Sequence, residues 1–237
     1  MFVLITFRKG NMNQKLGTKN HSNKTDWTTY YERKRSFFST FTQRSTLEMI
    51  NKFYDMTGYA SNTKSNSIYS VIELGGGNSC FAGNFCERNA LQVYDIIDNN
   101  NLSVQLFEKM KLRVVSHKGL LINLTEYTNP KTQYDFVYSI GLIEHFDPAE
   151  RSMVIKNHFQ YCKNKGYVLI SFPTPTRKYR FWRKVMEILG LWQFWDETPL
   201  YYKDVKQDIE KYGNILKVEL NKKLFLTQML IFAKKHT

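Results

Sequence analysis

Apolar runs typical of β-strands alternate with segments of helical spacing between residues 68 and 173. Strands are predicted at 68–74, 91–98, 112–117, 134–140 and 167–172, with helices at 79–89, 101–110 and 147–166. Two further β-like runs follow between 213 and 235 with no helix between them, and "ELNKKL" is typical of a hairpin turn. This order predicts an α/β fold with a mostly parallel sheet, helices on both of its faces and an antiparallel hairpin at the C-terminus.

The helix predicted over 147–166 has the clearest boundary residues. Asp147 is a predicted N-cap, Pro148 occupies the first helical position, and Glu150 completes a capping box. Gly166 is predicted to lie just past the end of the helix. The shorter helix predicted over 101–110 has Leu102, Leu106 and Met110 on one side.

Composition suggests one globular domain with an N-terminal extension. The 237 residues are 42% hydrophobic and 15% aromatic, enough for a sizeable core. Residues 1–25 are polar and predict a flexible tail, whereas 26–65 predict a helical lid with an apolar stripe at Leu47, Ile50 and Phe53 or Tyr54. The main domain is expected at 66–237.

Charge and cysteine content indicate partners and location. There are 34 Lys and Arg against 21 Asp and Glu, so the net charge is +13, which either attracts an anionic ligand or reflects compositional bias. The three cysteines lack zinc-ligand spacing and predict buried thiols, no metal site and a reducing, cytoplasmic location. No apolar run approaches the length of a membrane span.

Three glycines follow the first predicted strand directly, in "SVIELGGGNSC" at 70–80. Glycine permits positive φ and lets a ligand lie on bare backbone, so Gly75, Gly76 and Gly77 predict a ligand seat at the end of this strand. Glu73, just before them, would repel a phosphate, and the dinucleotide and phosphate-loop fingerprints are both incomplete. The pattern favours a cofactor with cationic groups and no phosphate.

Four motifs in this order resemble the class I S-adenosylmethionine-dependent methyltransferases, over residues 68–237. "VIELGGGNS" resembles their first motif, "YSIGLIEHF" (138–146) their fourth-strand motif, "NKGYVLISFP" their fifth strand, and the terminal hairpin their last two strands. The resemblance implies a Rossmann-like sheet of seven strands, S-adenosyl-L-methionine (SAM) as cofactor and S-adenosyl-L-homocysteine (SAH) as product.

The resemblance also implies the cofactor-binding residues. Glu73 would face the amino-acid part of SAM, and an acid after the second strand would bind the ribose. Asp98 is preferred to Asp95 there, because Asp98 leads into a helix and Asp95 could lie within the strand. The implied set is Glu73, Gly75, Gly76, Gly77, Asn78, Asp98, Asn99, Ser139 and Ile140. The family's acid after strand three is missing from "HKGLLINL", which leaves adenine to backbone, Asn123, Leu120 or Leu121.

His145 and Glu144 follow the fourth predicted strand, near where the family places the transferring methyl group. Imidazole titrates near neutral pH, so His145 is predicted to be a base or to orient the acceptor, with Glu144 beside it. The alternative is that the pair only orders the loop. His158, on the next helix, is predicted to be a packed or surface histidine.

Residues 173–202 are predicted to cap the acceptor pocket. Arginine forks suit phosphate, and aromatic faces suit a sugar or a base. The predicted acceptor-binding residues are Tyr179, Arg180, Trp182 and Asp196, together with Tyr31 from the N-terminal lid that also holds Trp27 and Tyr30. The alternatives are an amphipathic surface helix in the cap and N-terminal aromatics that pack on the core.

These features predict methyl transfer to a hydroxyl of an anionic small molecule, such as a phosphorylated or nucleotide-linked sugar of bacterial capsule or polysaccharide biosynthesis. A small phosphorylated amine is the nearest alternative. The charge favours an RNA or protein methyltransferase, but "SIGLIE" stands where a base-extruding motif would lie, so nucleic acid is not the expected partner. A non-catalytic binding protein is opposed by the intact glycines and acids.

Overall fold

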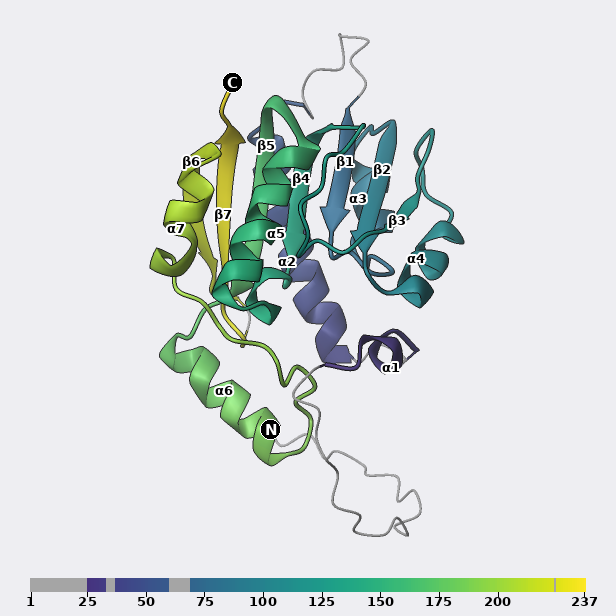
Figure 1. The fold of residues 1–237 in the computed structure, drawn as a ribbon. Coiled ribbons are helices and arrows are strands. Elements are labelled where there is room, and N and C mark those ends of the chain that lie inside the picture. The colour runs from purple at the N-terminus through teal and green to yellow at the C-terminus, as the bar shows by residue number, and fades with distance from the viewer. Residues whose placement is uncertain (1–24, 33–36, 60–68, 224) are drawn as a thin grey trace.

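The computed structural model describes residues 25–32, 37–59, 69–223 and 225–237. They contain a seven-stranded sheet of order β3-β2-β1-β4-β5-β7-β6 (Figure 1). The strands are β1 (Ser70–Leu74), β2 (Val93–Asp98), β3 (Gly119–Leu121), β4 (Tyr134–Ile140), β5 (Cys162–Pro173), β6 (Gly213–Asn221) and β7 (Gln228–Lys235). β1 to β5 are parallel to one another, and β7 is antiparallel to both β5 and β6. The predicted fold class is confirmed, while the predicted tail lies outside the described residues except for Thr25.

Helices cover both faces of the sheet (Figure 1). α5 (Pro148–Tyr161) and α7 (Lys203–Glu210) share one core cluster, and α2 (Phe37–Asp55), α3 (Ala82–Arg88) and α4 (Asn101–Glu108) share the other. α1 (Trp27–Glu32) and α6 (Arg177–Ile188) instead lie beyond the carboxyl ends of the parallel strands. That edge is where α/β sheets bind their ligands.

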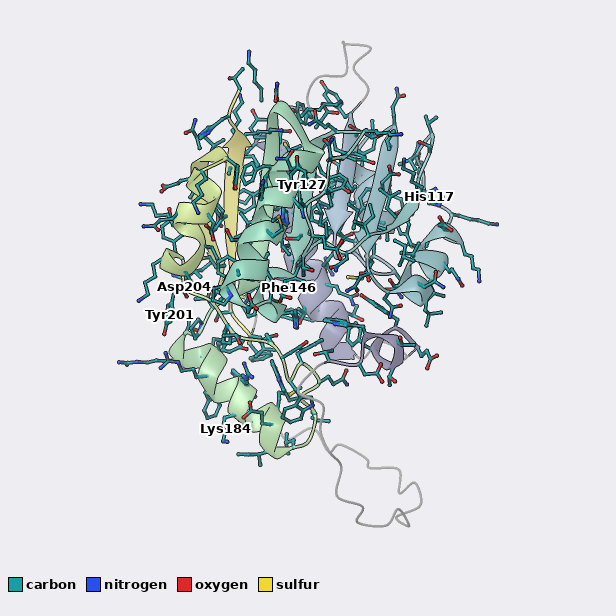
Figure 2. The ribbon with its side chains drawn as sticks, in the orientation of Figure 1. His117, Tyr127, Phe146, Lys184, Tyr201 and Asp204 are labelled. Atoms are coloured by element: carbon teal, nitrogen blue, oxygen red, sulfur yellow. The ribbon has the colours of Figure 1, made fainter. Side chains whose placement is uncertain are left out.

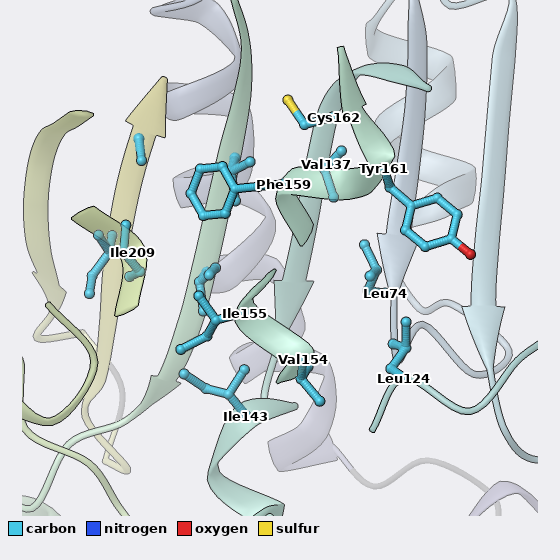
Figure 3. Close-up of a cluster of buried hydrophobic side chains, with 14 of the residues drawn as sticks. Leu74, Leu124, Val137, Ile143, Val154, Ile155, Phe159, Tyr161, Cys162 and Ile209 are labelled. Atoms are coloured by element: carbon cyan, nitrogen blue, oxygen red, sulfur yellow. The ribbon is translucent and has the colours of Figure 1, made fainter. Parts of the chain in front are cut away.

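The central strands are buried on both faces, as expected of a parallel sheet between two helical layers. All five residues of β1 are buried. Ile72 and Leu74 pack toward α5 and α7, in the cluster shown in Figure 3, and Val71 packs toward α2 and α3. This arrangement explains why the strands appear in the sequence as continuous apolar runs rather than as alternating patterns.

α5 begins where predicted and ends earlier. The Asp147 side chain accepts hydrogen bonds from two backbone N–H groups of the first turn, at 2.9 and 3.0 Å. The helix ends at Tyr161, because the chain enters β5 at Cys162. Gly166 lies inside β5, where an added Cβ would be 2.8 Å from Cys162 Sγ and 3.0 Å from the Asp135 carbonyl oxygen. The prediction of a helix reaching Gly166 is wrong, and this glycine serves close packing instead.

The third strand was predicted at 112–117 and lies at Gly119–Leu121. Within 112–117 only Ser116 forms an isolated bridge to β2, and the Val115 side chain is 80% exposed. Gly119 passes directly against α4, where an added Cβ would come within 2.6 Å of Val104 Cγ1. The chain therefore joins the sheet at the residue that fits beneath the helix, not at the β-branched residues before it.

The predicted helical stripes have different outcomes. In α2, Ile50, Phe53 and Tyr54 are buried with Leu47 packed against them, which confirms the stripe. In α4 the buried residues are Ser103, Val104 and Phe107, whereas Leu102 and Leu106 on the predicted side are half-buried. The large Phe107 ring, rather than the leucines, enters the core.

Candidate functional site

The glycine loop is fixed to the carboxyl end of the neighbouring strand. The backbone N–H groups of Gly75 and Gly76 donate to the Ile97 carbonyl at 2.8 and 3.2 Å. Gly75 has φ +66° and Gly77 has φ +53°, a region that favours glycine. The loop lies at the carboxyl ends of β1 and β2, where Gly75 and Gly76 are half-buried and Gly77 is buried against Tyr31.

Asp98 lies at the end of β2, beside this loop. Its carboxylate accepts hydrogen bonds from the N–H groups of Gly77 at 2.9 Å and Asn100 at 2.8 Å. Burial raises its pKa even though these donors act in the opposite direction. Asp95 instead lies within the strand, where Tyr134 Oη donates to it at 2.6 Å and the Lys118 N–H at 2.9 Å. Of the two acids, the structure places Asp98 at the glycine loop.

Glu73 is a buried carboxylate held by hydroxyl groups. Its Oε2 accepts from Ser79 Oγ at 2.5 Å, Tyr94 Oη at 2.8 Å and Tyr138 Oη at 3.0 Å. Burial raises its pKa to about 7, and the three hydroxyl donors limit that rise. A carboxylate with this pKa changes its charge near neutral pH and would gain from a cationic partner.

The helix α1 reaches this loop through one side chain. Tyr31 Oη donates to Asp98 Oδ2 at 3.4 Å, and an added Cβ on Gly77 would lie 2.5 Å from Tyr31 Cε1. Asn100 Nδ2 also donates to Thr28 Oγ1 at 2.9 Å, which ties α1 to the start of α4. Tyr31 was predicted to bind the acceptor, whereas the structure places it against the glycine loop and Asp98.

The other predicted cofactor-binding residues differ from one another in their burial and contacts. Asn78 and Ile140 are half-buried and Asn99 is exposed, all at the sheet edge. Ser139 is fully buried, and its Oγ lies 2.8 Å from His158 Nε2. His158 is a packed histidine, as predicted, so the Ser139 side chain is engaged with the core.

His145 is paired with a carboxylate from the predicted cap. It closes the short helix η1 (Ile143–His145), just before the labelled Phe146 in Figure 2. Its Nδ1 lies 3.0 Å from Asp196 Oδ1, which also accepts from Thr25 Oγ1. Burial lowers the pKa of His145, but the Asp196 bond and nearby carboxylates outweigh it and raise that pKa. Burial acts to raise the pKa of Asp196, but the hydrogen bonds with His145 and Thr25 outweigh it and lower that pKa to about 2.

Aromatic rings enclose this pair. Trp27 from α1 meets the His145 ring edge-on at 5.0 Å between centroids, and Phe194 lies 6.2 Å from it. Side chains from α1 and from the segment after α6 therefore meet at His145. The sequence indicated Trp27 as a lid residue, but Phe194 carried no signal of its own because a lone aromatic in a loop has many uses.

Two further carboxylates lie near His145. Glu144 is 2% exposed, its Oε2 has no hydrogen-bond partner among the described residues, and burial raises its pKa to about 8. Glu197 accepts from Tyr179 Oη, and its carbonyl accepts from Arg183 at 3.1 Å. Burial raises the pKa of Glu197 as well. The surroundings of His145 are thus acidic and aromatic.

The other two predicted acceptor residues of the cap, Arg180 and Trp182, each contact an aromatic side chain. Arg180 donates to Tyr201 Oη at 2.7 Å, and the Trp182 ring packs on Phe225 at 4.7 Å between centroids. Of the predicted acceptor residues, Asp196 contacts His145 directly. Tyr179 is linked to the surroundings of His145 through its hydrogen bond to Glu197.

The sequence matches a known protein family. Residues 24–204 match the family model described as "Methyltransferase domain". The chain belongs to this methyltransferase family. The match spans more than half of the sequence and includes the glycine loop, Asp98, His145 and Asp196. No curated protein sequence matches the chain.

Solved methyltransferases share the fold at low sequence identity. Magnesium protoporphyrin IX methyltransferase from Synechocystis PCC 6803 with bound SAH has a TM-score of 0.66 and 14% identity, covering 88% of this chain and 92% of that one. A SAM-dependent methyltransferase from Methanosarcina mazei has 0.57 and 14%, covering 76% and 96%. An N-methyltransferase from Bradyrhizobium japonicum WM9 with SAH has 0.53 and 7%, covering 78% and 86%. The protein is a SAM-dependent methyltransferase.

The residues present fit SAM. Gly75 and Gly77 have no room for a Cβ, which would collide with Leu142 and Tyr31, and Asp98 offers a carboxylate suited to a ribose diol. Glu73 offers a buried carboxylate whose Oε2 accepts three hydroxyl groups, and a carboxylate suits an ammonium group. The donor set has the chemistry that the cofactor requires.

The part of the chain that the structure describes contains no group of three or more His, Cys, Asp or Glu side chains arranged to hold a metal ion. None of its helices combines the length and apolarity needed to cross a bilayer. Cys86 and Cys162 are buried free thiols, while Cys80 is half-buried rather than buried as predicted.

Proposed function

We propose that this methyltransferase transfers a methyl group from SAM to a hydroxyl of a polar small molecule, with His145 as the general base. The observation that carries the proposal is the His145–Asp196 pair, 3.0 Å apart, at the sheet edge beyond the glycine loop. A carboxylate at Nδ1 fixes the imidazole tautomer and leaves Nε2 as the basic nitrogen.

Each residue of the pair has a defined part. SAM, when bound, supplies an electrophilic methyl group on a sulfonium. His145 Nε2 removes the proton of the acceptor hydroxyl, and Asp196 stabilises the imidazolium that forms. Trp27 and Phe194, packed around the imidazole, exclude water and narrow the approach of the acceptor. Residues 26–65 then act as the lid and 173–202 as the acceptor cap.

The cofactor contacts follow the same geometry. We assign the ribose hydroxyls to Asp98, the amino-acid part to Glu73, and the passage beneath SAM to Gly75 and Gly77. The support is the shared position of all four at the carboxyl ends of β1 and β2.

The acceptor is proposed to be a phosphorylated or nucleotide-linked sugar. The net charge of +13 and the exposed cations of α6 support an anionic acceptor. Glu144, Asp196 and Glu197 surround His145, so the anionic group would bind away from the reacting hydroxyl, nearer the surface. A sugar whose phosphate lies far from the reacting hydroxyl fits both the positive charge of the protein and the acidic surroundings of His145.

A small amine is a second candidate acceptor. The buried Glu144 Oε2 has no partner within the described residues, and such an oxygen is costly unless a ligand supplies a donor. An ammonium group would supply that donor. His145 would then deprotonate the amine rather than a hydroxyl.

The test measures SAH formation with a panel of sugar phosphates, nucleotide sugars and amines, followed by mass spectrometry and NMR of the product. His145→Ala and Asp196→Asn should lower turnover while leaving SAM binding by calorimetry unchanged, with the exposed His236→Ala as the matched control. Turnover should rise with pH above 6.5, because the pKa of His145 is raised and only the neutral imidazole is a base. Full turnover by His145→Ala would refute its role, and N-methylated product would select the second candidate.

A further inference from the structure

The outer side and the C-terminal end of α6 expose large apolar side chains. Phe181 is 61% and Ile188 74% exposed, and their spacing of seven residues places them on one side of the helix. Leu189 and Leu191, at the end of the helix, are 61% and 54% exposed. We call Ile188, Leu189 and Leu191 the apolar tip.

Cations flank these apolar side chains. The sequence of α6, RKYRFWRKVMEI, holds five Arg and Lys residues and one Glu. Arg177 and Lys184 are exposed and lie one turn before Phe181 and Ile188 respectively, on the same side. Figure 2 shows Lys184 at the end of the molecule beyond the sheet. Exposed apolar residues bordered by cations on a helix are typical of proteins that bind an anionic bilayer surface.

The opposite side of α6 faces the protein. Tyr179 is its one buried residue and donates to Glu197, and the Arg183 guanidinium lies over the Trp192 ring at 4.8 Å. The helix is thus anchored by one side, and its apolar and cationic side is left for a partner. The bulk charge of +13 gives the whole protein the sign that an anionic surface attracts.

We propose that α6 docks this methyltransferase on an anionic membrane surface, with the apolar tip inserted at the headgroup level and Arg177 and Lys184 against the lipid phosphates. The same helix borders the candidate acceptor site, so docking would present that site to acceptors held at the bilayer. This last consequence rests on the proposed function, whereas the docking itself does not.

Vesicle sedimentation tests the docking. The full chain should sediment with vesicles of phosphatidylcholine mixed with phosphatidylglycerol, and not with phosphatidylcholine alone. Ile188→Ser/Leu189→Ser/Leu191→Ser should weaken this binding by about tenfold or more, through lost apolar insertion. Arg177→Gln/Lys184→Gln should weaken it by about fivefold for each cation, and added salt should do the same.

Matched controls separate docking from folding and from catalysis. Val115→Ser and Leu216→Ser replace apolar side chains that are 80% and 50% exposed elsewhere, and they should bind vesicles like the wild type. SAM binding by calorimetry should be unchanged in every variant. The proposal is overturned if the chain ignores anionic vesicles, or if the tip variant binds them as well as the wild type does. A dimer in solution that the tip variant converts to a monomer would also overturn it, since a second copy would then cover the tip.

Discussion

The buried His158 provides a quantitative test of the core. Its Nδ1 lies 2.7 Å from the Val154 carbonyl oxygen, which can only accept, so Nδ1 carries the proton. Nε2 is then an acceptor, and Ser139 Oγ donates to it at 2.8 Å. Burial disfavours the imidazolium and lowers the pKa of His158 from 6.5 to about 4. The folded protein therefore holds this histidine neutral at pH 7.

The sign of the pH dependence follows from this lowered pKa. Between pH 6.5 and about 4, the unfolded chain binds a proton at His158 that the folded chain does not. The stability contributed by this residue is present above pH 6.5 and is lost as the pH falls. The full loss corresponds to about 3 kcal/mol, most of which has gone by pH 4.5.

The perturbation is His158→Gln, studied by urea unfolding at pH 7 and pH 4.5. At pH 7 the variant should be less stable by about 1–3 kcal/mol, because the buried Ser139 hydroxyl loses its partner. At pH 4.5 this gap should close or reverse, because only the wild type has lost most of the stability, about 3 kcal/mol, that the neutral His158 contributes. Burial raises the pKa of Glu73 to about 7 and of Glu144 to about 8, so protonation of these two groups stabilises the fold as the pH falls. Their contributions are the same in the wild type and the variant, so they cancel in the difference between the two free energies of unfolding.

An equal gap at the two pH values would refute the reasoning. The exposed His236→Gln is the control for loss of an imidazole elsewhere, and it should be as stable as the wild type at pH 7. If His158→Gln does not fold, the wild type alone suffices, because its His158 ring signals in NMR should not titrate above about pH 5.

Three further predictions concern the cofactor. Asp98→Ala should weaken SAM binding by about 1–3 kcal/mol in calorimetry, whereas Asp95→Ala should mainly lower the melting temperature, and the reverse result would remove Asp98 from the ribose. SAM affinity should rise from pH 6 to pH 8, because the pKa of Glu73 is about 7 and only its carboxylate attracts an ammonium group, and Glu73→Gln should abolish that rise. Tyr31→Ala removes the ring that lies against the glycine loop and should speed SAM association and dissociation in stopped-flow measurements, whereas unchanged rates would contradict a lid role.

Much of the fold and of the cofactor loop could be predicted from the sequence, because the signals are local. The apolar runs of β1 and β5, the cap at Asp147 and the glycines after Glu73 each depend on a few consecutive residues. The preference for Asp98 over Asp95 had the same basis, since a strand end and its following helix are visible within ten residues. The third strand was misplaced because β-branched residues favour a strand anywhere, while only packing against α4 selects Gly119.

The tertiary structure decided which side chains contact one another at the candidate site. Asp196 reaches His145 across 51 residues and Tyr31 reaches Asp98 across 67, and no spacing rule connects either pair. The same holds for Arg180, which contacts Tyr201 across 21 residues. Periodicity and caps are properties of a single segment, whereas the partner of a side chain depends on how segments pack, which is set by the burial of the whole core.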